Sequence, residues 1–219
     1  VEQAHRRGVR LFCVSESDSI DWKTDSTYWI VRDVLEALQQ LATAVREEAD
    51  HLNYVIGVTG SNGKTIVKEW LHTLLGGSTK GIYRSPASFN SQLGVALSIL
   101  HLPTTSRIAI FEAGISQAGE MQKLEEMIYP TIGLLTNIGS AHDAGFSGSE
   151  EKINEKAILF KRAEKVVYRG GNDDVKRTLD AQNNDAISWS QSAQNSTLTV
   201  SYNAHSFSIL NNATTEEAN

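Results

Sequence analysis

The sequence predicts an α/β fold built on a doubly wound, mostly parallel sheet. Three observations support this fold class. Between Val55 and Tyr168, short apolar runs alternate with longer segments whose apolar residues recur at helical spacing. The run Val55–Thr59 leads through a glycine-containing loop directly into the first of these helical segments. Strands separated by helices of this length pair in parallel through right-handed crossovers.

The first fifty residues are predicted to be the C-terminal remnant of a separate α/β domain. An apolar run from Val9 to Val14 predicts a strand, and the polar residues 18–26 predict a loop. A helix is expected after Asp33, because the apolar residues at 34, 35, 38, 41, 42 and 45 share one face and Asp33 suits the N-cap. The chain begins with Val1, so we expect a fragment of a longer protein.

A central domain is predicted from residue 51 to residue 210. Its expected parallel strands are Val55–Thr59, Ile82–Arg84, Arg107–Phe111, Thr131–Thr136 and Lys165–Tyr168. Its expected helices are Lys64–Leu75, one capped by Asn90, Gly119–Ile128 and Glu150–Ala163. The first helix is expected to turn Ile66, Val67, Trp70, Leu71 and Leu74 inward and to end at Gly76-Gly77.

The chain changes character after about Ser188. Leu198–Tyr202 and Ser206–Leu210 alternate apolar and polar residues, which predicts a small antiparallel hairpin at the C-terminal end of the central domain. Residues 211–219 contain little apolar surface to bury and are expected to form a linker or a disordered tail.

Composition excludes several classes of partner. The formal net charge is −6, and the basic residues are scattered, which argues against nucleic acid as a partner. No apolar run approaches the roughly 20 residues that span a bilayer, so no membrane insertion is expected. The single cysteine, Cys13, and the lack of a secretory signal predict a cytoplasmic protein.

The loop Gly60–Thr65 predicts a phosphate-binding site. Loop N–H groups and the positive end of a helix face one point, where Lys64 can pair with nucleotide phosphates and the Thr65 hydroxyl can hold Mg²⁺. The common Walker pattern has a glycine where this chain has Val58, so the loop is a variant of that pattern. The alternative is a glycine-rich turn that only caps an ordinary helix.

Polar residues at the other strand exits are expected to gather around this loop, because ligands of open α/β sheets bind at the carboxyl ends of the strands. The predicted exits carry Asn90, Glu112, Asn137 and His142. Taken singly, each has an ordinary structural explanation, such as a surface charge or a helix cap. Their joint placement around a phosphate loop favours a site, since Mg²⁺ requires oxygen ligands.

Four segments in this order resemble the Mur ligases. They are Thr-Gly-Ser-Asn-Gly-Lys-Thr from residue 59, Ser-Phe-Asn-Ser-Gln-Leu-Gly-Val from residue 88, Glu-Ala-Gly-Ile-Ser-Gln-Ala-Gly-Glu-Met from residue 112 and Thr-Asn-Ile-Gly-Ser-Ala-His-Asp-Ala-Gly-Phe from residue 136. The resemblance covers residues 29–160 and is closest to the MurF branch, in the subtype whose ligase is fused to an alanine racemase.

The resemblance implies a role for each site residue. Gly60, Ser61, Asn62, Gly63, Lys64, Thr65 and Asn137 would bind ATP. Two Mg²⁺ would be held by Thr65, Glu112, His142 and Lys156, the last as a carbamate. Lys64, Asn90, His142 and Lys156 would also act in catalysis, with Asn90 near the γ-phosphate and His142 near the acceptor carboxylate.

The implied reaction adds D-alanyl-D-alanine to UDP-N-acetylmuramoyl-tripeptide through an acyl phosphate. A complete Mur ligase has three domains. This chain has no residues for the C-terminal one, so we expect it to be inactive alone. Two alternatives remain: a folylpolyglutamate-synthase-like ligase, against which the Ala141-His142 pair argues, and a nucleotide-binding module without ligase chemistry.

Overall fold

The computed structural model describes residues 1–16, 19–139, 145–182, 185–190, 198–202 and 205–210. Its centre is an eight-stranded sheet with the strand order β4-β5-β3-β6-β7-β8-β10-β9. All neighbours from β4 to β8 are parallel, which confirms the predicted fold class. The strands are β3 (Tyr54–Thr59), β4 (Ile82–Arg84), β5 (Ile108–Glu112), β6 (Ile132–Leu135), β7 (Lys165–Arg169), β8 (Asp185–Ser190), β9 (Leu198–Tyr202) and β10 (His205–Leu210).

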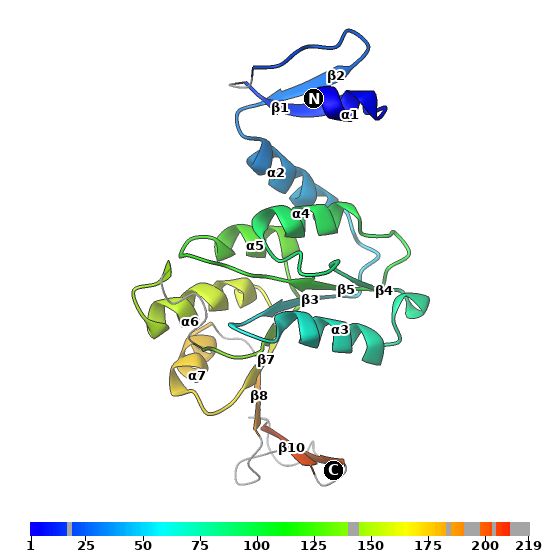
Figure 1. Ribbon diagram of the computed structural model, residues 1–219. Coiled ribbons are helices and arrows are strands. Elements are labelled where there is room, and N and C mark those ends of the chain that lie inside the picture. The colour runs from blue at the N-terminus through cyan, green and yellow to red at the C-terminus, as the bar shows by residue number, and fades with distance from the viewer. Residues whose placement is uncertain (17–18, 140–144, 183–184, 191–197, 203–204, 211–219) are drawn as a thin grey trace.

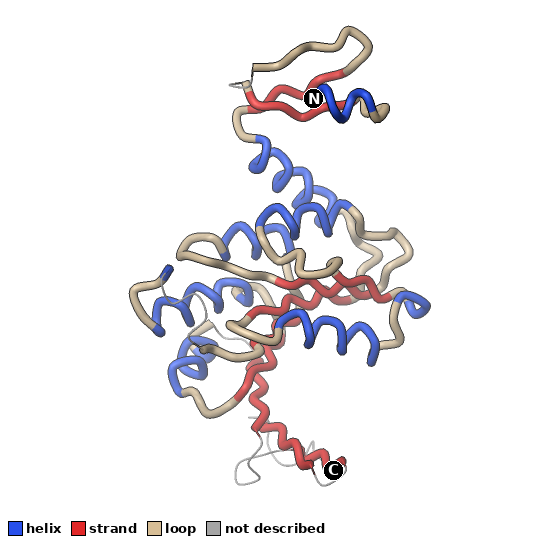
Figure 2. Tube along the Cα trace, viewed as in Figure 1, coloured by secondary structure: helices blue, strands red, loops and turns tan. Residues whose placement is uncertain are grey.

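The predicted C-terminal hairpin is part of this same sheet. Strands β9 and β10 pair antiparallel, and β10 pairs antiparallel with β8. Strand β8 and the preceding helix α7 (Asp173–Asp180) were not predicted from the sequence. Helix α7 contributes only two buried side chains, Val175 and Leu179, so its apolar signal is weak. Figure 2 shows the strands running without a break from the centre of the molecule toward the C-terminus.

Helices cover both faces of the sheet. Figure 1 shows α2 (Val34–Glu47), α4 (Gln92–Leu100) and α5 (Met121–Ile128) on one face and α3 (Lys64–Leu74) on the other. Side chains alternate along β3 accordingly: Val55 belongs to the larger core on the α4–α5 side, and Ile56 and Val58 belong to the smaller core beneath α3. Helix α6 (Ser149–Ala157) continues as a 3-10 turn (Ile158–Phe160), so it ends before the predicted Ala163.

Helix α3 is rotated relative to the prediction. Val67 and Leu71 pack inward as expected. Ile66, Trp70 and Leu74 are 57%, 67% and 82% exposed, so their predicted inward orientation is wrong. The helix carries two apolar stripes about one residue apart, one through Ile66 and Trp70 and one through Val67 and Leu71. The sheet contacts the stripe through Val67 and Leu71. Gly76 ends the helix with φ +99°, in agreement with the sequence.

The N-terminal segment forms a small unit of its own. Helix α1 (Glu2–Arg6) and the parallel pair β1 (Leu11–Ser15) and β2 (Thr27–Val31) lie apart from the large sheet (Figure 1). Helix α2 follows, and its predicted cap is present: the Glu36 amide donates to Asp33 Oδ1 at 2.8 Å. Ala42 of α2 is fully buried in the core of the central unit, while the domain boundary near residue 50 remains a prediction.

Gly133 of β6 is a test of this packing. A Cβ at this position would lie 2.3 Å from Cδ1 of Phe160, whose ring is fully buried. We expect Gly133→Ala to lower the free energy of unfolding by about 1–3 kcal/mol through overpacking, measured by urea denaturation.

Gly148→Ala is the matched control. Gly148 has an extended backbone, and nothing lies within 4 Å of an added Cβ. We expect Gly148→Ala to lower the free energy of unfolding by less than about 1 kcal/mol, which is the scale of a helix-cap change. Equal unfolding midpoints for the two variants would contradict the packing of Phe160 against β6.

Candidate functional site

The exits of neighbouring parallel strands meet at one edge of the sheet. Strands β5, β3 and β6 are adjacent, and β4 lies beside β5, so their carboxyl ends point the same way. The loops that follow these strands carry residues 60–63, 85–90, 113–114 and 136–139, and Lys64 and Thr65 begin helix α3 directly after the first of them. This edge is where ligands of open α/β sheets bind.

The loop between β3 and α3 depends on glycine. Gly60 has φ +143°, and a Cβ there would lie 2.0 Å from Thr136 Oγ1. Gly63, the N-cap of α3, has φ +79° in the left-handed region. Both conformations are rarely open to other residues. They allow the chain to turn sharply and aim the first N–H groups of α3, which have no acceptor within the helix, at the edge of the sheet.

The exit of β6 holds this loop in place. The Ser61 amide donates to the Asn137 carbonyl at 2.8 Å, and the Asn62 amide donates to Asn137 Oδ1 at 2.9 Å. The Thr136 hydroxyl donates to the Asn62 carbonyl at 2.6 Å. Asn137 therefore supports the loop through both its backbone and its side chain.

Lys64 lies back over the loop. Its Nζ donates to the Gly60 carbonyl at 2.9 Å. Burial lowers the pKa of Lys64, and the Glu112 carboxylate opposes this shift. The ammonium group is therefore partly desolvated. Because of this, it attracts an anion more strongly than it would in bulk water.

Glu112 is the buried centre of the site. The residue is 1% exposed, at the end of β5. The Thr65 hydroxyl donates to its Oε2 at 2.8 Å, and Asn90 Nδ2 donates to its Oε1 at 2.7 Å. Three residues predicted from separate parts of the sequence are thus in direct contact.

The sequence predicted that Asn90 caps α4, and this prediction is wrong. The cap is Ser91, whose Oγ accepts from the Gly94 amide at 3.2 Å. The Asn90 side chain is directed at Glu112 instead, and its carbonyl accepts from the Gly114 amide at 2.8 Å. A Cβ at position 114 would lie 2.9 Å from Asn90 Cγ, so glycine is needed beside the amide.

Lys156 approaches the loop from α6. It is 2% exposed, and its Nζ lies 3.4 Å from the Gly60 carbonyl. Burial first, and then the nearby charges of Lys64 and Lys152, lower the pKa of Lys156 to about 8. The predicted site residue His142 lies outside the described residues, so its position relative to Lys156 is untested.

Several residues of this site were not predicted. Lys68 and Lys152 are buried lysines, and Lys152 donates to the Gly139 carbonyl. Ser88 lies with its Oγ 3.4 Å from Thr65 Oγ1. For Lys68 a signal was present, because it follows Lys64 by four residues and shares its helix face. Ser88 begins the family-like segment 88–95, which is a second such signal, whereas nothing in the sequence distinguishes Lys152 from a surface residue.

The donor set suits a hard cation bound together with phosphate. Among the residues that the structure describes, no three histidine, cysteine or acidic side chains gather into a metal cluster. The site offers two oxygen donors, the Thr65 hydroxyl and the Glu112 carboxylate, 2.8 Å apart. Mg²⁺ is held in this way by one or two protein oxygens, with phosphates and water completing its shell.

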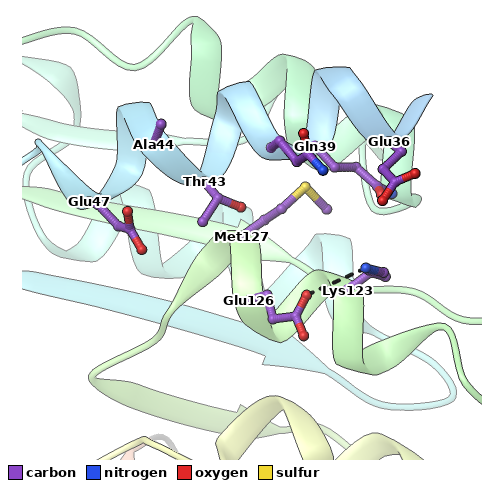
Figure 3. Close-up of a pocket in the computed structure, with 9 residues that line it drawn as sticks. Glu36, Gln39, Thr43, Ala44, Glu47, Lys123, Glu126 and Met127 are labelled. Atoms are coloured by element: carbon purple, nitrogen blue, oxygen red, sulfur yellow. Dashed lines mark ion pairs between the residues drawn. The ribbon is translucent and has the colours of Figure 1, made fainter. Parts of the chain in front are cut away.

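Two cavities differ in their position relative to the site. One of about 370 Å³ adjoins it at the exits of β6 and β7 and is lined in part by Asn137, Ile138 and Arg169. The other, of about 410 Å³, lies between α2 and α5 and is lined by residues such as Glu36, Glu47 and Glu126 (Figure 3). None of the residues lining the second cavity lies at a strand exit, so the second cavity does not adjoin the site.

No helix in the described part of the chain has both the length and the apolar composition needed to cross a bilayer.

The chain is similar to known proteins over most of its length. The sequence profile of the Mur ligase middle domain matches residues 58–217. The UDP-N-acetylmuramoyl-tripeptide--D-alanyl-D-alanine ligase of Bacillus subtilis is 40% identical over 158 residues, which are 72% of this chain and 34% of that protein. The chain thus spans about a third of the length of this relative.

Two solved structures share the fold. A crystal structure of MurF from Acinetobacter baumannii superimposes with a TM-score of 0.77 at 24% identity, over 100% of this chain and 50% of that one. The MurF ligase from Thermotoga maritima, in complex with ADP, gives 0.74 at 21% identity, over 93% of this chain and 55% of that one. With its profile match over most of its length, the chain belongs to the Mur ligase family and contains the middle domain of that family.

Proposed function

We propose that the strand-exit site binds ATP with Mg²⁺ and serves a ligase that adds D-alanyl-D-alanine to UDP-N-acetylmuramoyl-tripeptide. The observation that carries the proposal is the contact between the Thr65 hydroxyl and the buried Glu112 carboxylate, directly beside the glycine loop. The substrates follow from the name of the B. subtilis relative. The ATP that such a reaction consumes supports the predicted cytoplasmic location.

The nucleotide phosphates would bind at the start of α3. The amides of Ser61 and Asn62 donate to Asn137, so the amides best placed for phosphate are those of Gly63, Lys64 and Thr65. Lys64 Nζ would exchange the Gly60 carbonyl for a phosphate oxygen. Gly60, Ser61, Asn62 and Asn137 would then shape the loop.

A first magnesium ion would be held by Thr65 and Glu112, and it would neutralise phosphate charge while an anionic acceptor approaches. Asn90 fixes the other oxygen of Glu112 and so orients the carboxylate. In the proposed reaction the tripeptide carboxylate displaces ADP from the γ-phosphoryl group. The D-alanyl-D-alanine amine then displaces phosphate from the acyl phosphate, and one amide bond forms.

The remaining parts of the prediction are proposals that rest on sequence resemblance. They are a second metal site with His142 and the Lys156 carbamate, and a fused alanine racemase domain in the parent protein. They also include the assignment of residues 1–50 to a substrate-binding domain, of residues 51–210 to the ATP domain and of residues 211–219 to a linker.

The proposed reaction can be tested by product formation. The chain and any longer form that contains it should be incubated with ATP, Mg²⁺, UDP-N-acetylmuramoyl-tripeptide and D-alanyl-D-alanine, and the products followed by mass spectrometry. We expect amide product and an equal amount of phosphate from the longer form and none from this chain alone. A parallel incubation of the longer form should contain ATP, Mg²⁺, a folate and glutamate. Product from that incubation alone would contradict the proposed substrates and favour a folylpolyglutamate-synthase-like ligase.

Removal of the Thr65 hydroxyl should weaken metal-dependent nucleotide binding. We expect Thr65→Ala to lower ADP affinity by about 10-fold to 100-fold in Mg²⁺, measured by calorimetry, because one metal ligand is lost. Affinity in EDTA should stay the same. Thr65→Ser keeps the hydroxyl and is the matched control. A loss of equal size with and without Mg²⁺ would contradict a metal ligand at this position.

Lys156 should form a carbamate more readily than an ordinary lysine. Its neutral amine attacks CO₂, an N–C bond forms and one proton leaves. With a pKa of about 8, the neutral fraction grows as pH rises from 7 to 9. Under ¹³CO₂ at constant partial pressure, we expect a carbamate resonance that increases over this range and is absent from Lys156→Arg.

Two groups serve as controls for the carbamate signal. The α-amine of the chain should give a separate resonance in every variant. Lys123→Arg changes an exposed lysine that pairs with Glu126 at 3.8 Å, and it should keep the Lys156 signal. An unchanged spectrum in Lys156→Arg would rule out the carbamate.

A further inference from the structure

Helix α3 buries a lysine beneath its apolar face. Lys68 is 0% exposed, although the helix turns Ile66 and Trp70 toward solvent. A buried ammonium group is retained only where it is paired and hydrogen-bonded, because its removal from water is costly. Its partners therefore indicate what it does.

Those partners come from three separate elements. Lys68 Nζ donates to the Ser85 carbonyl at 2.9 Å and to the Ala87 carbonyl, both in the loop after β4. It also lies 3.8 Å from Glu112 Oε2 at the end of β5. On its own helix it lies 3.4 Å from Glu69, which pairs with Arg84 of β4. One side chain thus connects the phosphate-loop helix with the two adjacent strand exits.

The loop after β4 is held in an uncommon conformation. Ala87 has φ +42°, in the left-handed region that side chains other than glycine rarely adopt. Such a conformation persists only where the surroundings enforce it. Immediately after Ala87 come Ser88, 3.4 Å from the Thr65 hydroxyl, and Asn90, which donates to Glu112.

We propose that Lys68 is a positioning residue that clamps the 85–90 loop against α3, so that Asn90 and Ser88 meet the Thr65–Glu112 pair. It acts through the Ser85 and Ala87 carbonyls and touches no reacting atom. The consequence for metal binding rests on the proposed function. The clamp on the 85–90 loop is a property of the protein alone, so an experiment can contradict the clamp without contradicting the proposed function, and the reverse.

Hydrogen exchange of the loop is the direct test. Lys68→Met keeps the length of the side chain and removes its charge and donors, and Lys123→Met is the control on the exposed face of α5. We expect exchange across residues 85–90 to rise about tenfold or more in Lys68→Met, while β3 and β5 stay protected. Unchanged exchange in the loop, or an equal rise throughout the sheet, would overturn the clamp.

A measurement on the unaltered chain covers the case in which Lys68→Met does not fold. With ¹⁵N-labelled lysine, a clamped Lys68 ammonium group should exchange slowly and show cross-peaks to the α-protons of Ser85 and Ala87. If these cross-peaks are missing, Lys68 does not hold the loop.

Nucleotide binding separates positioning from a general effect on the fold. We expect Lys68→Met to lower ADP affinity about tenfold in Mg²⁺ and to leave affinity in EDTA unchanged. Equal losses in both conditions would contradict positioning of the metal site. If the unaltered chain itself shows no Mg²⁺-dependent binding, the proposed function fails, and loop exchange still decides the role of Lys68.

Discussion

The site depends on one carboxylate that is buried away from water and whose two oxygens both need hydrogen-bond donors. Glu112 is 1% exposed, and its two oxygens are satisfied separately, one by the Thr65 hydroxyl and the other by the Asn90 amide. A buried carboxylate without such donors would be costly. Its partners come from α3 and from the loop after β4, so the requirements of this one group determine how two segments approach β5.

The glycine loop is constrained in a similar way from the other side. Gly60 brings the backbone against Thr136. Asn137 accepts hydrogen bonds from two loop amides, one through its backbone carbonyl and one through its side-chain oxygen. The glycine loop is therefore bound on one side to the exit of β6, and helix α3 is bound on the other side to β5. The central position of β3 between those strands makes both connections available.

Much of this arrangement could be predicted from sequence, because it follows from local patterns. The strand that became β3, the glycine loop and the Asp33 cap are determined by residues close together in the chain. The rotation of α3 could not be predicted, since its stripes through Trp70 and Leu71 are equally apolar and only contact with the sheet selects one. The prediction that Asn90 caps a helix was wrong for a related reason. The Asn90 side chain bonds to Glu112, which lies 22 residues away in the sequence.

Lys64 and Lys156 share the Gly60 carbonyl as an acceptor, and Lys152 donates to Gly139 nearby. Before any carbamate forms on Lys156, this places three ammonium groups beside the loops that follow β3 and β6. Their combined field repels a divalent cation that approaches by itself and attracts a polyanion. In the proposed function, bound phosphates would reverse the sign of that field at Thr65 and Glu112. Under the proposed function, the metal would therefore enter the site together with the nucleotide that carries it.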